Sequence, residues 1–431
     1  MTQILEARKG HITEEMEKVA LIEGVTPEFI REGVAKGHIV IPKNKFRDRS
    51  KICGIGGGLD VKVNGLMGTS SDRNDMEMEA KKLRILEECG ANAFMDLSTG
   101  DDIDAMRKQS LEISNIAAGC VPVYQASVEA IDKHGSMVAM TEDELFATVE
   151  KQCQEGMDFM AIHSALNWSV LNALKKSGRV ADVVSRGGSF LTAWMFHNQK
   201  ENPLYEHFDR LLEILKATDT VLSIGDAIRP GANADSLDHA QVQGLIVAGE
   251  LTKRALEAGV QVMIEGPGHV PLNQIATTMQ LQKQLCYGVP YYILGFLATD
   301  VAPGYDNITG AIGGAFAGMH GADFLCYLTP AEHLGLPNED DVRIGVRTTK
   351  IAADAANVLK RGGNAWNQSL AIAKARVARD EKTEIENSLD PEYLAAKKAL
   401  EPESHGCAAC KDSRCPADIA CLLYTSPSPR D

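Results

Sequence analysis

Short apolar runs alternate with amphipathic stretches through the middle of the chain, from about residue 59 to residue 330. The stretches between the runs repeat their apolar positions at helical spacing, as in Met76–Cys89, Glu142–Glu155 and Leu245–Ala258. Buried parallel strands joined by crossover helices produce this alternation, so we predict an α/β fold that closes as a (β/α)8 barrel. Nine strand candidates stand where such a barrel takes eight, and one of them is expected to lie outside it. The candidates begin at Val61, Ala93, Val121, Phe159, Asp182, Val221, Val260, Tyr291 and Asp323.

Helical patterns flank the barrel on both sides. Before it, Ile12–Glu23 and Pro27–Lys36 are predicted helices, followed by an extended segment at Ile39. After it, Asp341–Arg361 and Leu370–Glu386 carry the clearest helical patterns. The expected parts are a small N-terminal domain over 1–58, the barrel domain over 59–340, C-terminal helices over 341–400, a flexible cysteine-containing tail over 401–421 and a disordered or foreign tail over 422–431.

The composition narrows the expected partners and compartment. The 431 residues carry a formal net charge of −15, which argues against nucleic acid because phosphate neutralisation needs a basic surface. No run of 18 apolar residues occurs, so no membrane span is expected. Six of the ten cysteines are scattered, mostly within apolar runs, which fits reduced thiols in a cytoplasmic protein.

Three other cysteines lie close together near the end of the chain. Cys407, Cys410 and Cys415 have a spacing that can hold three irons of a four-iron–four-sulfur (4Fe-4S) cluster and leave the fourth iron open. An open iron can bind and reduce a small molecule, and the usual partner in such chemistry is S-adenosylmethionine. A zinc knuckle completed by His405 or Cys421 fits the same spacing, so the cysteines alone leave both alternatives open.

Polar side chains follow the strand candidates at or just beyond their C-terminal ends. In a (β/α)8 barrel, that edge carries the active site. A helix cap or a turn explains one such residue equally well, but the repetition around the barrel favours a shared site. The residues are Asp96, Tyr124, His163, Ser185, Arg186, Asp226, Arg229, Glu265, Tyr292 and His333.

Two kinds of chemistry are indicated at this edge. The tight turn Glu265-Gly-Pro-Gly-His269 presents a carboxyl group and an imidazole to one cavity, and His269 with His333 can ligate a metal that keeps open positions. The segments 185–189 and 226–231 combine glycines with an arginine, which favours a phosphorylated substrate. A helix-capping histidine and a structural Arg–Asp pair remain the plain alternatives.

Eight segments are specific enough to compare with a known family. They begin at Met95 (Met-Asp-Leu-Ser-Thr-Gly), Val121 (Val-Pro-Val-Tyr-Gln-Ala), Val184 (Val-Ser-Arg-Gly-Gly-Ser), Glu201 (Glu-Asn-Pro-Leu-Tyr-Glu-His-Phe-Asp), Ile264 (Ile-Glu-Gly-Pro-Gly-His-Val-Pro-Leu), Asp300 (Asp-Val-Ala-Pro-Gly-Tyr-Asp), Ala311 (Ala-Ile-Gly-Gly-Ala) and Phe324 (Phe-Leu-Cys-Tyr-Leu-Thr-Pro-Ala-Glu-His-Leu). With the C-terminal cysteines, they resemble phosphomethylpyrimidine synthase of thiamine biosynthesis, a radical S-adenosylmethionine family. The resemblance covers roughly residues 1–420 and disfavours the zinc knuckle.

The resemblance implies a homodimer of (β/α)8 barrels, each with a mobile tail that carries a 4Fe-4S cluster. It implies a carbon–carbon lyase that acts on 5-aminoimidazole ribotide with S-adenosylmethionine and an electron donor such as flavodoxin or ferredoxin. Cys407, Cys410 and Cys415 match the cluster ligands, and His269 and His333 match the ligands of a zinc or iron ion. Glu265 and His163 are the expected catalytic groups. The positions that resemble substrate contacts are Met95, Tyr124, His163, Ser185, Arg186, Gly187, Asp226, Arg229, Glu265 and Tyr292.

The chain departs from the family pattern in the pocket. Leu66 replaces the second asparagine of the usual Val-Asn-Ala-Asn-Ile-Gly, and the segments 225–231 and 295–300 also differ from their usual forms. Two products therefore remain open. The first is 4-amino-5-hydroxymethyl-2-methylpyrimidine phosphate, favoured by family prevalence. The alternative is 5-hydroxybenzimidazole, the cobamide lower ligand that a paralogous synthase makes from the same ribotide. A catalytically inactive binding subunit is disfavoured because the cysteine and histidine sets are complete.

Overall fold

The computed structural model describes residues 1–359, 363–400, 416, 420 and 424. These residues belong to two compact units, Met1–Ala365 and Trp366–Asp431. The first unit contains the barrel that the hydrophobic pattern predicts, preceded by a small helical part.

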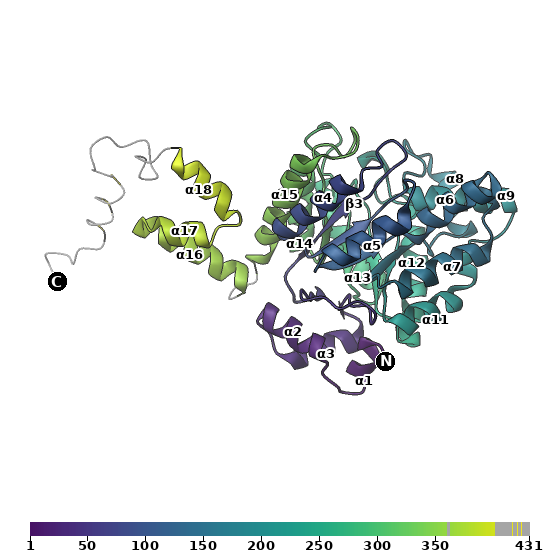
Figure 1. The fold of residues 1–431 in the computed structure, drawn as a ribbon, viewed down its shortest axis with the longest axis horizontal. Helices are drawn as coiled ribbons and strands as arrows, with labels where there is room; N and C mark the ends of the chain where they lie inside the picture. The colour runs from purple at the N-terminus through teal and green to yellow at the C-terminus, as the bar shows by residue number, and fades with distance from the viewer. Residues whose placement is uncertain (360–362, 401–415, 417–419, 421–423, 425–431) are drawn as a thin grey trace. The chain divides into compact units, whose positions relative to one another are not determined.

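Three short helices and a two-stranded antiparallel sheet precede the barrel and pack around an apolar cluster of their own (Figure 1). The hydroxyls of Thr13 and Thr26 accept backbone N–H groups at the start of the second and third helices, and Gly24 and Gly37 end these helices in the left-handed conformation. The predicted helices of this part are confirmed. The elements are α1 Gln3–Arg8, α2 Glu14–Glu23, α3 Pro27–Lys36, β1 Ile39–Val40 and β2 Ile55–Gly56.

Eight parallel strands close into a barrel in the order β10-β3-β4-β5-β6-β7-β8-β9, which confirms the predicted (β/α)8 fold. Neighbours in the barrel are consecutive along the chain because each crossover returns the chain to the same end of the sheet. The strands are β3 Lys62–Met67, β4 Ala93–Asp96, β5 Ala117–Cys120, β6 Phe159–Ile162, β7 Val221–Ile224, β8 Val262–Glu265, β9 Tyr291–Ile293 and β10 Phe324–Cys326. The helices of this part are α4 Met76–Glu88, α5 Ile103–Ile113, α6 Pro122–His134, α7 Glu142–Gln154, α8 Trp168–Ser177, α9 Arg186–Asn198, α10 Pro203–Glu206, α11 Phe208–Thr218, α12 His239–Ala258, α13 Leu272–Leu285, α14 Asp306–Met319 and α15 Glu339–Asn357, with short 3-10 turns η1 Met137–Ala139 and η2 Asn233–Asp235.

Two of the nine strand candidates are not strands of the barrel. The candidate at Asp182 is the one outside the barrel, because residues 182–185 form a loop that leads into α9. The candidate at Val121 is wrong: the strand β5 ends at Cys120, and Pro122 is the first residue of α6. Proline lacks the backbone N–H that a central strand needs, and it fits the first turn of a helix.

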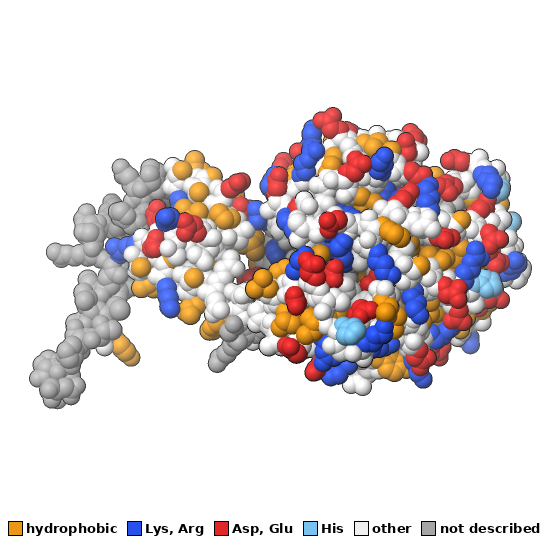
Figure 2. All heavy atoms as spheres, turned by 60° about the horizontal axis from the view of Figure 1, so that its bottom comes forward, with side chains coloured by type: hydrophobic (Ala, Val, Ile, Leu, Met, Phe, Trp, Pro, Cys, Tyr) orange, Lys and Arg blue, Asp and Glu red, His pale blue; other side chains and the backbone are white. Residues whose placement is uncertain are grey.

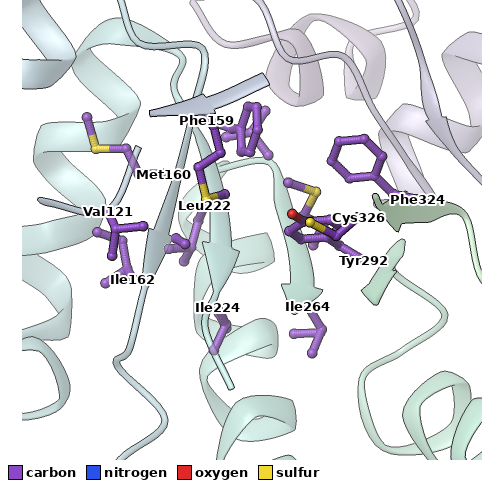
Figure 3. Packing of buried hydrophobic residues seen from close by; sticks show 14 of the residues in the cluster. Val121, Phe159, Met160, Ile162, Leu222, Ile224, Ile264, Tyr292, Phe324 and Cys326 are labelled. Carbon is purple, nitrogen blue, oxygen red and sulfur yellow. The ribbon is translucent and has the colours of Figure 1, made fainter. Parts of the chain in front are cut away.

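Aromatic side chains fill the lower part of the barrel interior. Phe159 and Phe324 begin β6 and β10, and their ring centroids lie 6.1 Å apart (Figure 3). Tyr292 packs on Phe324 with a centroid distance of 4.6 Å. Gly119 leaves room for Phe159, since a Cβ atom at Gly119 would lie 2.2 Å from the Phe159 ring. This packed layer forms the floor beneath the polar groups at the C-terminal ends of the strands.

The second unit contains the remaining described helices. Residues Leu370–Glu386 do not form the single helix that the sequence predicts, because the chain turns at Arg379, where φ is 57°. Asp380 then caps the next helix by accepting the backbone N–H of Thr383 at 3.1 Å. The helices are α16 Asn364–Ala378, which begins at the end of the first unit, α17 Glu381–Glu386 and α18 Pro391–Ala399.

The visible face of the first unit carries charged side chains of both signs, interspersed with one another (Figure 2). Among the helices that the structure describes, none is long and apolar enough to cross a membrane.

Candidate active site

Arg229 lies among polar side chains that come from several strands. It follows β7, and its Nη1 atom donates a hydrogen bond to the backbone oxygen of Asp226 at 3.4 Å. Its positive charge acts on the pKa of His163, which follows β6, of Asp226, and of Glu265, which ends β8. The structure therefore brings together four of the residues that the sequence places at strand ends.

His163 is buried beneath two glycines. A Cβ atom at Gly187 would lie 2.3 Å from Cε1 of the ring, and one at Gly225 would lie 3.1 Å from Cδ2. Burial and the nearby Arg229 cation lower the pKa of His163 to about 3, so the imidazole is neutral at neutral pH. Its Nδ1 atom has no hydrogen-bond partner among the described residues. Buried polar atoms are normally satisfied, so this nitrogen is a candidate contact for a ligand.

Two carboxyl groups lie beside Arg229, that of Glu265, which is buried, and that of Asp226, which is partly buried. Burial raises the pKa of Glu265 to about 7, with Arg229 opposing the shift and Asp226 adding to it. Burial also raises the pKa of Asp226 to about 6, again against the effect of Arg229. The Oε2 atom of Glu265 lacks a hydrogen-bond partner within the part of the chain that the structure describes. A carboxyl group that titrates near neutral pH can both donate and accept a proton.

The N-terminus of α9 forms a second wall of the site. Ser185 is buried and caps this helix by accepting the N–H of Gly188 at 3.2 Å. Gly188 allows the helix to pack on the loop after β7, since a Cβ atom there would lie 2.2 Å from the backbone oxygen of Ala227. The guanidinium of Arg186 lies 5.4 Å from the ring centroid of Tyr124. A helix N-terminus with an arginine beside it favours an anionic ligand.

The remaining predicted contacts line the inside and the mouth of the barrel. Tyr292 is buried, and its hydroxyl accepts a hydrogen bond from the Asn64 side chain at 2.8 Å. Met95 is paired in register with Leu66 near the ends of β4 and β3. Leu66 lines a cavity of about 770 Å³, and its backbone oxygen accepts the hydroxyl of Tyr327 at 2.9 Å.

Two of the residues that line this cavity, Glu79 and Lys82, were not predicted from the sequence. Arg186 and His333 line it, and so do Glu79 and Lys82 of α4. The last two form an ion pair at 2.6 Å, and both side chains are only 2% exposed. An acid and a base three residues apart on an amphipathic helix predict a solvated pair, so the sequence held no signal for this cavity wall.

The two predicted metal ligands lie side by side. The rings of His269 and His333 have centroids 5.5 Å apart. The Nδ1 atom of His269 lies 2.7 Å from Asp300, and that of His333 lies 2.8 Å from Asp306. A carboxylate on Nδ1 fixes the tautomer that leaves Nε2 free for a metal, as is usual for metal-binding histidines. Sequence analysis missed both aspartates, although they are the first and last residues of a segment that it singled out.

The predicted cluster ligands Cys407, Cys410 and Cys415 lie outside the described residues, as do His405 and Cys421. Within the described ranges, no group of three or more His, Cys, Asp or Glu side chains is arranged to hold a metal ion.

A closed parallel barrel with polar side chains gathered at the C-terminal ends of its strands defines the class of (β/α)8-barrel enzymes. Comparison with known proteins gives the family. The model of the Radical SAM ThiC family matches residues 2–421, and the chain belongs to this family. Its members are radical S-adenosylmethionine enzymes, and the chain is an enzyme of this type. Membership implies S-adenosylmethionine and a 4Fe-4S cluster.

The similar relatives fall into two groups. A protein of Eubacterium limosum named 5-hydroxybenzimidazole synthase BzaB is 93% identical over 424 residues, which cover 98% of this chain and 99% of the relative. A BzaB of Moorella thermoacetica is 61% identical over 424 residues, with the same shares. A phosphomethylpyrimidine synthase of Dehalococcoides mccartyi is 52% identical over 413 residues, 96% of either chain.

Proposed function

We propose that this chain is a radical S-adenosylmethionine synthase that converts 5-aminoimidazole ribotide to 5-hydroxybenzimidazole. The observation that carries the proposal is the 93% identity to a BzaB relative over nearly the full length of both chains. The pyrimidine synthase relative is 52% identical, so the benzimidazole alternative is better supported than the thiamine product that sequence analysis placed first. Leu66, which lines the cavity, is one of the departures that such a product would exploit.

The phosphate of the ribotide is assigned to the wall formed by the α9 N-terminus and the loop after β7. Arg229 and Arg186 supply positive charge, and the N-terminus of α9 adds the positive end of its helix dipole. Ser185 keeps this helix end in place by capping it. The neutral reacting part of the ribotide then lies toward Met95, Tyr124 and Tyr292, the apolar and aromatic contacts that the resemblance implies.

Proton transfer is assigned to Glu265. The pKa of Glu265, raised to about 7 by burial, lets the group hold or release a proton at Oε2 near neutral pH. The pKa of His163, lowered to about 3, makes this imidazole a neutral hydrogen-bonding group that orients the substrate. Asp226 keeps Glu265 protonated to a higher pH by its own negative charge. The reduced cluster and S-adenosylmethionine supply a carbon radical when bound.

A zinc or iron ion is assigned to His269 and His333. The fit rests on the two carboxylate–histidine contacts, which leave the Nε2 atoms of both rings available as ligands. With two protein ligands, the ion keeps positions for the methionine part of S-adenosylmethionine. Replacing both histidines with alanine should remove the ion and leave the iron–sulfur absorbance unchanged.

The electron donor, the oligomeric state and the location in the cell are proposed from the family resemblance. An electron donor such as flavodoxin or ferredoxin, a homodimer and a cytoplasmic location are part of the proposal. Buried free thiols support a reducing compartment, and they include Cys53, Cys120, Cys153, Cys286 and Cys326.

The deciding experiment is anaerobic turnover of 5-aminoimidazole ribotide by the reconstituted protein, with the product identified by mass. A product with the mass of 5-hydroxybenzimidazole supports the proposal, and the pyrimidine phosphate refutes it. Substituting Cys407, Cys410 or Cys415 with alanine should abolish formation of 5′-deoxyadenosine. Cys421→Ala is the matched control and should keep the cluster. Loss of the cluster from this control alone would contradict the ligand assignment.

A further inference from the structure

One carboxylate joins three neighbouring loops at the C-terminal face of the barrel. Asp300 follows β9, and its Oδ1 atom lies 2.7 Å from Nδ1 of His269, which follows β8. Its Oδ2 atom accepts the backbone N–H of Asn233 at 2.7 Å. Asn233 begins η2, in the same loop after β7 that carries Asp226 and Arg229. Asp300 therefore contacts a proposed metal ligand with one oxygen and the proposed phosphate-binding loop with the other.

The loop after β7 is held from its other side by a separate clamp. Arg179 donates to the backbone oxygens of Ile228 at 2.7 Å and Arg229 at 3.4 Å, while Asp238 pairs with its guanidinium at 2.7 Å. Arg179 thus fixes the part of the loop that contains Arg229. The contact with Asp300 fixes the loop further along, at Asn233, and joins it to the metal site.

The second aspartate provides an internal contrast. Asp306 lies 2.8 Å from Nδ1 of His333 through Oδ1, and its Oδ2 accepts the N–H of Gly304 at 3.1 Å. Both contacts stay within the segment after β9 and the loop that carries His333. Asp306 therefore orients one histidine, whereas Asp300 orients the other and also contacts the loop after β7.

We propose that Asp300 is a positioning residue that couples the two ligand sites, so that the metal ion and the phosphorylated substrate each tighten the binding of the other. The inference rests on the proposed function for the identity of both ligands. The physical reason is that both ligands need loops held by one carboxylate, so the ligand that binds first fixes Asp300 for the second. Coupling of this kind is reciprocal between the two binding free energies.

The test measures zinc binding by equilibrium dialysis on the full chain with its cluster in place, without S-adenosylmethionine or reductant, in the presence and absence of 5-aminoimidazole ribotide. Zinc is quantified by mass spectrometry, so the cluster irons do not interfere. The wild-type protein should bind zinc at least about 5-fold more tightly with the ribotide present. Asp300→Asn should weaken zinc binding by about 10- to 100-fold and abolish the effect of the ribotide. Asp306→Asn should weaken zinc binding to a similar extent and keep the effect of the ribotide.

Several outcomes overturn the inference. Unchanged zinc affinity in Asp300→Asn refutes the positioning role, and an undiminished ribotide effect in this variant refutes the coupling. Loss of the ribotide effect in both aspartate variants shows that any metal-site defect suffices, which also refutes a special role for Asp300. Asp300→Glu, which restores a carboxylate, should recover part of the zinc affinity, whereas a folding defect would not be rescued. Zinc retained by the double variant His269→Ala/His333→Ala overturns the metal site itself, a separate failure of the proposed function.

Discussion

The two ends of the barrel bury ionisable groups in opposite ways. At the N-terminal end, Asp158 accepts from Arg47 at 2.6 Å, lies 3.3 Å from Arg49, and also accepts the backbone N–H groups of Asn44 and Ala118 at 2.9 Å. Its charge is matched and its hydrogen bonds are made by the protein. These contacts fasten the segment before the barrel to the bottom of the sheet, which is a structural role.

At the C-terminal end, buried polar atoms lack partners among the described residues. They include Oε2 of Glu265, Nδ1 of His163 and Oδ1 of Asn64. A displaced pKa alone does not make this distinction, because burial raises the pKa of Asp219 at the bottom to about 7 as well. Both oxygens of Asp219 accept hydrogen bonds, from the backbone N–H of Gln3 at 2.8 Å and from Gln261 at 3.3 Å. The N-terminal end also has two unsatisfied atoms, Nε of Arg47 and Nε of Arg49, but both guanidinium groups pair with the Asp158 carboxylate. The ends therefore differ in kind, because the unsatisfied carboxyl oxygen and imidazole nitrogen at the C-terminal end belong to groups that no oppositely charged side chain contacts directly.

The largest expected effect on this contrast between the two ends comes from removing the Asp158 carboxylate at the N-terminal end of the barrel. Asp158→Ala leaves two buried arginines without their carboxylate and should destabilise the protein by about 3–5 kcal/mol. Thermal unfolding of the variant and the wild type measures the loss. The apparent Michaelis constant for the ribotide, measured on the folded fraction below the unfolding temperature, should stay unchanged. A variant that melts normally but binds the ribotide poorly would assign the bottom of the barrel a functional role.

The matched change at the top removes the cation at the centre of the site. Arg229→Ala should raise the apparent Michaelis constant for the ribotide by about 10- to 100-fold, because a charge-assisted hydrogen bond is worth about 1.5–3 kcal/mol. The constant for S-adenosylmethionine should change much less. Arg210, which pairs with Asp143 on the outer surface, offers the control Arg210→Ala, which should change neither constant. An effect confined to S-adenosylmethionine would mean that the loop serves the cosubstrate.

The hydrophobic pattern predicts the barrel well because parallel strands buried on both faces form apolar runs. It fails at β5, whose Ala-Ala-Gly-Cys sequence has no large or β-branched residue. The small residues there are required by packing from another strand, since Phe159 fills the space beside Gly119. That requirement comes from tertiary contacts and leaves no local signal.

The site shows the same division. His163, Asp226 and Glu265 could be predicted because the active site of a (β/α)8 barrel lies at the C-terminal ends of its strands, which follows from fold geometry and residue type alone. The same reasoning gives no role to Asp300 and Asp306. Each aspartate contacts a histidine of another loop, 31 and 27 residues away along the chain. Pairing between loops is decided by how the barrel closes, so it becomes visible only in the structure.

A smaller effect tests whether Glu265 is buried as a neutral acid. Its pKa is raised from 4.5 in the unfolded chain to about 7, so its stabilising contribution is complete below pH 4.5 and is lost as the pH rises through about 7. Glutamine does not titrate. The unfolding temperature of Glu265→Gln relative to wild type should therefore increase between about pH 5 and pH 8, by the equivalent of about 2 kcal/mol. His163, whose pKa is lowered, loses stability in the opposite direction as the pH falls below 6.5, but it is present in both proteins and cancels. A constant difference between the two proteins would mean that the folded protein does not hold Glu265 as a neutral acid.

The smallest change concerns one wall of the cavity and the choice of product. Leu66 lines the cavity, and its strand is held by the hydroxyl of Tyr327 on its backbone oxygen and by Glu79 on the N–H of Gly68 at 2.8 Å. Leu66→Asn should therefore change the chemistry of the wall without moving the strand. An added amide that finds no partner in the benzimidazole pathway costs about 1 kcal/mol or more, so formation of 5-hydroxybenzimidazole should fall several-fold, with or without a new product. Leu66→Met keeps the wall apolar and should retain the wild-type product and rate. The measurement is the product mass and the rate for the wild type and both variants. If Leu66→Asn gives the wild-type product at the wild-type rate, Leu66 does not determine product choice.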